Sequence, residues 1–230
     1  MTTVANSVAN SPYTDQQISA WLRGLLTIAW ADGHFDPEEQ ELIAQLTQDE
    51  LAPATELGSL EPISPQDLAA ILGGDRDTAE NFIRTAVMMA LANGVYSLEE
   101  AKVINQFLDA LGLEVKALKS LEQTLYDPDK HKLETNALNP PQDPSVDVLA
   151  PVRDWLEGMD MKDPRVARFV CKMVPPQCPF ERDIKLFGHK IVHIPPMCKL
   201  NPLYDQLVGL RFRALTYLAD DCEEDVSKYC

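Results

Sequence analysis

The chain contains the sequence WLRGLLTIAWADGHFDPEEQELIAQL at residues 21–46, and 61 residues later it contains FIRTAVMMALANGVYSLEEAKVINQF at residues 82–107. Aligned at this offset, the two stretches share the identical pairs Arg23/Arg84, Ala29/Ala90, Ala31/Ala92, Gly33/Gly94, Glu38/Glu99, Glu39/Glu100, Ile43/Ile104 and Gln45/Gln106. Self-similarity at a fixed offset indicates a repeated supersecondary unit. The sequence therefore predicts an N-terminal domain built from two copies of one helical hairpin.

Each copy has the signals of two helices joined at a glycine. An apolar helix runs into Gly33 in the first copy and into Gly94 in the second, and glycine adopts the positive φ of a helix end at little cost. A second helix then begins with an N-cap residue followed three positions later by glutamate, the capping-box pattern. The capping pairs are Asp36 with Glu39 and Ser97 with Glu100.

Further helices are predicted elsewhere from helical spacing of apolar residues and from caps. Residues 63–75 predict a short helix that ends at Gly73-Gly74, with a new helix starting near Thr78. The helices predicted in the C-terminal part are residues 148–159, residues 164–174, and one capped by Asn201 that runs from Pro202 to Cys222.

Charge is divided unevenly along the 230 residues, whose 20 basic and 36 acidic side chains give a net charge of −16. Residues 1–138 hold 22 acidic and 8 basic side chains, a net −14, whereas residues 139–230 carry −2. An acidic surface repels a nucleic-acid backbone, so we expect no nucleic-acid partner. The basic face of residues 164–213 is expected either to be solvated or to dock on an acidic protein, on anionic lipid or on the N-terminal domain.

The composition divides the chain into four segments: a flexible N-terminus at 1–14, an all-helical domain at 15–126, a linker at 127–150 and a second domain at 151–230. The linker holds four prolines and almost no apolar periodicity. No stretch approaches the roughly 20 apolar residues that cross a bilayer, and the polar N-terminus lacks the pattern of a signal peptide. We therefore expect a cytoplasmic protein without a transmembrane segment, with peripheral membrane contact as the alternative.

Residues 183–194, DIKLFGHKIVHI, alternate like two strands about a two-residue turn at Gly188-His189. That turn sets the opposing pairs as Leu186 with Ile191 and Ile184 with His193. Extended outward, the same register brings Cys178 close to Cys198.

All five cysteines lie in the last 60 residues: Cys171, Cys178, Cys198, Cys222 and Cys230. Four converging thiolates hold zinc or an iron–sulfur cluster, and the candidate ligands are Cys171, Cys178, Cys198 and Cys222, with His193 as an alternative ligand. Two other interpretations stay open. The cysteines can be buried structural residues that behave as small apolar groups, or Cys178 and Cys198 can form a regulatory disulfide.

The two turns ADGHFDPEE at residues 31–39 and LANGVYSLEE at residues 91–100 resemble those of the TerB-like fold of tellurite-resistance and J-domain-associated proteins. This resemblance covers roughly residues 15 to 125 and implies an all-helical domain with this duplication. It also implies metal binding through turn acids, here Asp32 and Glu39, although Asn93 replaces the first acid in the second copy. Capping of helix ends explains the same acids without a metal.

Residues 164–230 closely resemble the small cyanobacterial domain named as the C-terminal region of Mo-dependent nitrogenase. The strings QCPFERDIKLFG (177–188) and HIPPMCKLNPLYDQLVGLRFRALTYLADDC (193–222) carry the match. The resemblance implies a cyanobacterial origin. Nitrogenase catalytic subunits are far larger and the chain has no P-loop, so we do not expect reduction of dinitrogen.

The chain contains no G-x-S-x-G, H-E-x-x-H or glycine-rich phosphate loop. We therefore predict a mainly α fold, a duplicated helical-hairpin TerB-like bundle followed by a small helix/β-hairpin/helix domain. The predicted function is a non-catalytic adaptor or stress-sensing protein with an unidentified protein partner. The alternative is a redox protein that binds an iron–sulfur cluster or zinc through the C-terminal cysteines, linked to nitrogen fixation or electron transfer.

Overall fold

The computed structural model describes residues 11–31, 61–91, 96–121, 149–174, 182–186, 189–194 and 203–229, with backbone alone for the strands. The described chain is mainly helical, as predicted. Its elements in order are α2 (Asp15–Ala29), α4 (Pro65–Leu72), α5 (Arg76–Leu91), α6 (Leu98–Leu111), α7 (Leu118–Leu121), α8 (Ala150–Glu157), α9 (Pro164–Met173), β1 (Arg182–Leu186), β2 (His189–Ile194), α10 (Tyr204–Thr216), the π-helix η3 (Tyr217–Asp221) and the 3-10 helix η4 (Ser227–Tyr229).

Two of the predicted helix boundaries are confirmed by their caps. The Ser97 hydroxyl accepts from the Glu100 backbone N–H at 3.2 Å, and the Glu100 carboxylate accepts from the Ser97 N–H at 3.1 Å, so α6 begins with a complete capping box. α4 ends at Gly73, and α5 begins three residues later at Arg76. The other predicted cap and turn residues, Gly33, Asp36, Glu39 and Gly94, lie outside the described residues.

The N-terminal helices pack around a chain of aromatic rings from three of them. Trp21 of α2 meets Phe82 of α5 edge-on, with ring centroids 5.8 Å apart, and Phe82 meets Phe107 of α6 in the same way at 5.6 Å. Such T-shaped contacts add to the stabilisation from burial. α2 approaches closely at Gly24, because a Cβ there would lie 2.6 Å from Leu68 and 2.7 Å from Phe82.

Arg23 and Arg84, which are aligned in the predicted repeat, each donate to a backbone carbonyl, but in segments that do not correspond at the 61-residue offset. The Nε of Arg23 donates to the backbone carbonyl of Glu61 at 2.8 Å, and the Nε of Arg84 donates to that of Trp155 at 3.0 Å. The second helix of the first copy lies outside the described residues, so the duplication itself stays a prediction.

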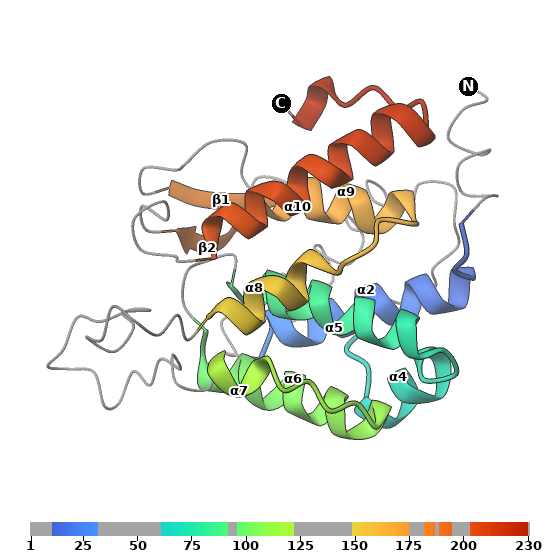
Figure 1. Ribbon diagram of the computed structural model, residues 1–230, viewed down its shortest axis with the longest axis vertical. Coiled ribbons are helices and arrows are strands. Elements are labelled where there is room, and N and C mark those ends of the chain that lie inside the picture. The colour runs from blue at the N-terminus through green and yellow to red at the C-terminus, as the bar shows by residue number, and fades with distance from the viewer. Residues whose placement is uncertain are drawn as a thin grey trace, which may run out of the picture.

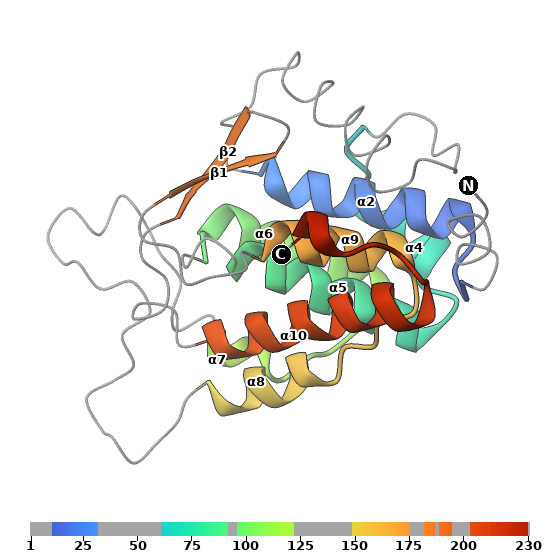
Figure 2. The same ribbon diagram turned by 90° about the horizontal axis from the view of Figure 1, so that it is seen from above.

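In the C-terminal part, α10 packs on α9 and lies beside α8, so that α8 and α10 form one edge of the molecule (Figure 2). The predicted helix start at Pro202 is two residues early, because α10 begins at Tyr204 and Leu203 gives it no side-chain cap. The predicted cap, Asn201, lies outside the described residues. The last turn was predicted as ordinary helix but is the π-helix η3, closed by a bond from the Cys222 N–H to the Tyr217 carbonyl at 3.1 Å.

β1 and β2 pair antiparallel in a register that differs from the predicted one. Their opposing residues are Arg182 with Ile194, Asp183 with His193, Ile184 with Val192, Lys185 with Lys190 and Leu186 with His189. Because Leu186 faces His189, the residues that connect the strands are 187 and 188 instead of the predicted 188 and 189. An irregularity between Ile184 and Lys185 brings the outer pairs one position closer to the predicted register, but Ile184 still lies opposite Val192, so both predicted pairings are wrong.

The two parts of the chain pack directly on each other. α8 contacts α5 and α7 (Figure 1). The buried apolar side chains from α2 through η4 form one cluster. At this contact the guanidinium of Arg84 lies 5.4 Å from the centre of the Trp155 ring. Most of the predicted linker lies outside the described residues, and its last residue, Ala150, is the first residue of α8.

Candidate functional site

Two of the four predicted cysteine ligands lie on neighbouring elements of the C-terminal part. Cys171 on α9 is 4% exposed, and Cys222, directly after η3, is 5% exposed. α9 and η3 are in contact. The other predicted ligands that lie outside the described residues are Cys178, Cys198, Asp32 and Glu39. His193 is described by its backbone in β2, opposite Asp183.

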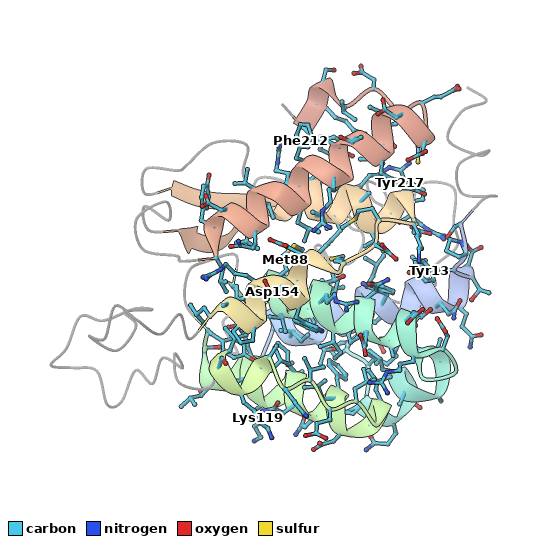
Figure 3. The ribbon with its side chains drawn as sticks, in the orientation of Figure 1. Tyr13, Met88, Lys119, Asp154, Phe212 and Tyr217 are labelled. Carbon is cyan, nitrogen blue, oxygen red and sulfur yellow. The ribbon has the colours of Figure 1, made fainter. Side chains whose placement is uncertain are left out.

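Within the described ranges, no group of three or more histidine, cysteine, aspartate or glutamate side chains has the geometry of a metal site. Cys222 directly follows η3, whose first residue, Tyr217, is labelled in Figure 3. Burial raises the pKa of Cys222, and the Tyr217 hydrogen bond and the charge of Arg168 oppose this rise without reversing it. An activated nucleophilic thiol has a lowered pKa, so this environment is that of a structural cysteine or of one that needs a metal to ionise.

A charged network ties the C-terminal segment, defined as residues 223–229, to α9. Arg168 is 2% exposed, and its Nη2 lies 2.8 Å from the Glu224 carboxylate, which Lys228 also contacts at 3.0 Å. Burial acts to raise the pKa of Glu224, but the hydrogen bond and charge of Arg168 outweigh burial and the pKa is lowered. The network therefore stabilises the ionised carboxylate.

The C-terminal segment also covers α10. Arg211 is 7% exposed, and its Nη2 donates to the backbone carbonyl of Tyr229. The Nε of Arg211 is buried without a hydrogen-bond partner in the described part of the chain. Unsatisfied buried polar atoms are costly, so the segment is held by Glu224 and by burial of Tyr229 against this cost.

Lys172 of α9 is half-buried under the same segment. Burial, with a smaller contribution from the charge of Lys228, lowers its pKa from 10.5 to about 8. Lys228 itself pairs with Glu224 and lies 4.9 Å from the centre of the Tyr229 ring. Lys172 is therefore the group of this site that titrates closest to neutral pH among those with a resolved shift.

A second charged cluster joins α9 to the N-terminal part. Asp163 caps α9 and is fully buried, as is Arg165, whose Nη2 lies 2.8 Å from the Asp163 carboxylate. The Nη1 of Arg165 lies 2.8 Å from Asp15 at the start of α2, and the Ser11 hydroxyl donates to Asp163 at 2.5 Å. The cluster thus connects residues about 150 positions apart.

These contacts change the interpretation of the basic face at residues 164–213. Arg165, Arg168 and Arg211 were expected on an exposed or docking face, but each is buried and bonded within the chain. Arg213 is exposed, and its Nη1 donates to the Glu157 and Met159 carbonyls at 2.7 and 3.2 Å, at the end of α8. For Arg165, docking on the N-terminal domain is the alternative that the contacts favour. Within the described ranges, no helix combines the length and the apolar character needed to cross a membrane.

These features define a mainly helical protein whose C-terminal part carries buried cysteines on helices closed by a charged C-terminal segment. Residues 148–230 match the family described as Mo-dependent nitrogenase C-terminus. The match begins two residues before α8 and confirms the resemblance of the C-terminal part; it does not extend to the N-terminal helices. Comparison with curated proteins and with solved structures found no significant match.

The sequence alone did not single out three residues of these networks: Asp163, Glu224 and Tyr217. Asp163 had a readable signal, because an Asp-Pro step marks an N-cap followed by the favoured first helical residue. Glu224 had no such sequence signal, since its partner Arg168 lies 56 residues away. Only the packing of the C-terminal segment on α9 brings the two side chains together.

Replacing Arg165 tests whether the buried cluster holds the two parts together. Arg165→Met leaves the fully buried Asp163 without its guanidinium and should lower the free energy of unfolding by roughly 3–5 kcal/mol. Asp15→Asn is the matched control; Asp15 is 63% exposed, so its loss should cost about 1 kcal/mol or less. Urea unfolding monitored by circular dichroism measures both. An Arg165→Met variant as stable as Asp15→Asn would contradict this account.

Replacing Lys172 tests the environment under the C-terminal segment. A lowered pKa means that folding disfavours the charged lysine, so wild-type stability should rise with pH between the folded value of about 8 and the unfolded value of 10.5. Lys172→Met should therefore melt at a higher temperature than wild type at pH 7, and this advantage should shrink by pH 9.5. Lys119→Met, at a position whose side chain is 71% exposed, should show no such dependence. Thermal melts from pH 7 to 9.5 measure this difference in melting temperature. A difference that grows with pH would refute the lowered pKa of Lys172.

Proposed function

We propose that the chain is a non-catalytic binding protein associated with nitrogen fixation, with an N-terminal TerB-like helical module and a C-terminal cysteine-bearing domain. The observation that carries this proposal is the match of residues 148–230 to the Mo-dependent nitrogenase C-terminus family. Asp163, Arg165, Arg168 and Glu224 are engaged in internal pairs, so these charges serve the fold, and the proposed partner would bind elsewhere on the surface.

The N-terminal assignment is supported by one feature of the repeat. Ser97 and Glu100 form the expected capping box. In this proposal the N-terminal helices also position the C-terminal domain, because Arg84 contacts Trp155 both by a hydrogen bond and through its ring.

The binding proposal is tested with the full chain and purified component proteins of molybdenum nitrogenase. Sedimentation velocity of the mixture should show a faster species that contains both proteins, because the proposal places the partner within that system. An acidic protein of similar size and charge replaces the chain in the control. Sedimentation no different from this control would refute the nitrogenase-linked binding function.

A second candidate function is metal or iron–sulfur binding through Cys171, Cys178, Cys198 and Cys222, with His193 as a substitute ligand. It is favoured by the burial of Cys171 and Cys222 on contacting elements. The strand register supports it further: Arg182 pairs with Ile194, and Cys178 and Cys198 stand four residues beyond them in sequence. The residues offer the four thiolates that zinc or a cluster requires.

Anaerobic purification followed by visible spectroscopy and elemental analysis tests this second function. A bound cluster should give a brown protein with visible absorption, and zinc should appear at one equivalent per chain. Cys171→Ser and Cys222→Ser should each lose the metal, whereas Cys230→Ser, outside the proposed set, should retain it. A colourless, metal-free wild-type protein would leave the cysteines as structural residues.

A further inference from the structure

α10 has an exposed stripe with a regular composition. The exposed residues of this helix recur at helical spacing on one side, while Leu207, Leu210 and Ala214 are buried on the other. The stripe consists of Asp205, Val208, Gly209, Phe212, Arg213 and Thr216. Figure 3 shows Phe212 on α10, at the end of the molecule opposite α4 and α6.

The centre of the stripe is unusually apolar for an exposed helix. Phe212 is 69% exposed and Val208 is 36% exposed, and they are one helical turn apart. A large exposed aromatic side chain is uncommon, because burying it against a partner is strongly favourable. Phe212 therefore offers an anchor for a helix docked on this face.

Gly209 lies between these two apolar residues, and contacts with the described part of the chain do not explain it. Glycine in a helix interior costs about 1 kcal/mol relative to alanine. Among the residues that the structure describes, a Cβ at this position would meet no atom within 4 Å, so their packing does not require glycine. The absent side chain does, however, leave the backbone of α10 open to close approach from outside.

The charges of the stripe are arranged symmetrically about Gly209. Asp205 stands four residues before it and Arg213 four residues after it, and both are exposed. The bonds from Arg213 to the Glu157 and Met159 carbonyls hold its guanidinium in place. If a second α10 crosses at Gly209 in the antiparallel direction, each Asp205 comes level with the Arg213 of the other chain. A parallel crossing would instead place like charges together.

We propose that the chain self-associates through α10, in an isologous antiparallel contact centred on Gly209. Phe212 of one copy packs against Val208 of the other, and Asp205 and Arg213 form two equivalent ion pairs. Opposite charge at both ends makes the surface complementary to itself, which is the condition for a closed two-fold dimer. One helix face is a small interface, so the dimer is a weak, concentration-dependent one.

Sedimentation velocity of the full chain over a concentration series tests this proposal. Wild type should pass from monomer to dimer as concentration rises. Asp205→Arg and Arg213→Asp should each raise the dimer dissociation constant at least about tenfold, because each places two like-charged pairs in the contact. Phe212→Ser should weaken the dimer similarly, and Asp109→Arg, an equal charge change on α6, should leave it unchanged.

The decisive measurement is whether a second charge reversal restores dimerisation. An equimolar mixture of Asp205→Arg and Arg213→Asp restores opposite charges at both positions, so the mixture should dimerise where each variant alone does not. The double variant should also recover by itself. Circular dichroism verifies that each variant remains folded. A wild-type chain that stays monomeric at every concentration, or a dimer indifferent to these charge reversals, would overturn the proposal.

Discussion

The buried pair between Asp163 and Arg165 is the interaction on which the arrangement of the C-terminal part depends. Both side chains are fully buried, and an unpaired charge at this depth would be very costly. Each charge is paired with the other, so neither is left unpaired. Asp163 also caps α9, and Arg165 also forms an ion pair with Asp15 of α2. One ion pair thereby fixes where α9 begins and which N-terminal helix it faces.

Two further arginines repeat this pattern at other contacts. Arg84 bonds the backbone of α8, and Arg168 bonds Glu224 of the C-terminal segment. The guanidinium group suits this task because it presents several donors in a fixed plane and keeps its charge when partly buried. Most of the described arginines of the C-terminal part thus form contacts between elements. This explains why a region rich in basic residues has few of these arginines on the surface.

The helices could be predicted because their signals are local in sequence. The strand register and the cysteine site could not, because they depend on contacts between distant residues. Ser97 and Glu100 lie three residues apart, so the cap of α6 was readable from sequence. The hairpin register was not, because one residue of difference in the turn shifts every pair, and the irregularity after Ile184 has no sequence signal. The cysteine site could be predicted only as a set of residue types, since the contact between α9, which carries Cys171, and η3, which precedes Cys222, joins residues about 50 positions apart.

The contact between Asp15 and Arg165 also has a consequence for synthesis on the ribosome. The two residues are 150 positions apart, so Asp15 leaves the ribosome long before its partner exists. At roughly 5–20 residues per second, the wait is on the order of 10–30 s. Until α8 is synthesised, the sides of α5 and α7 that pack on it remain uncovered and available to a chaperone.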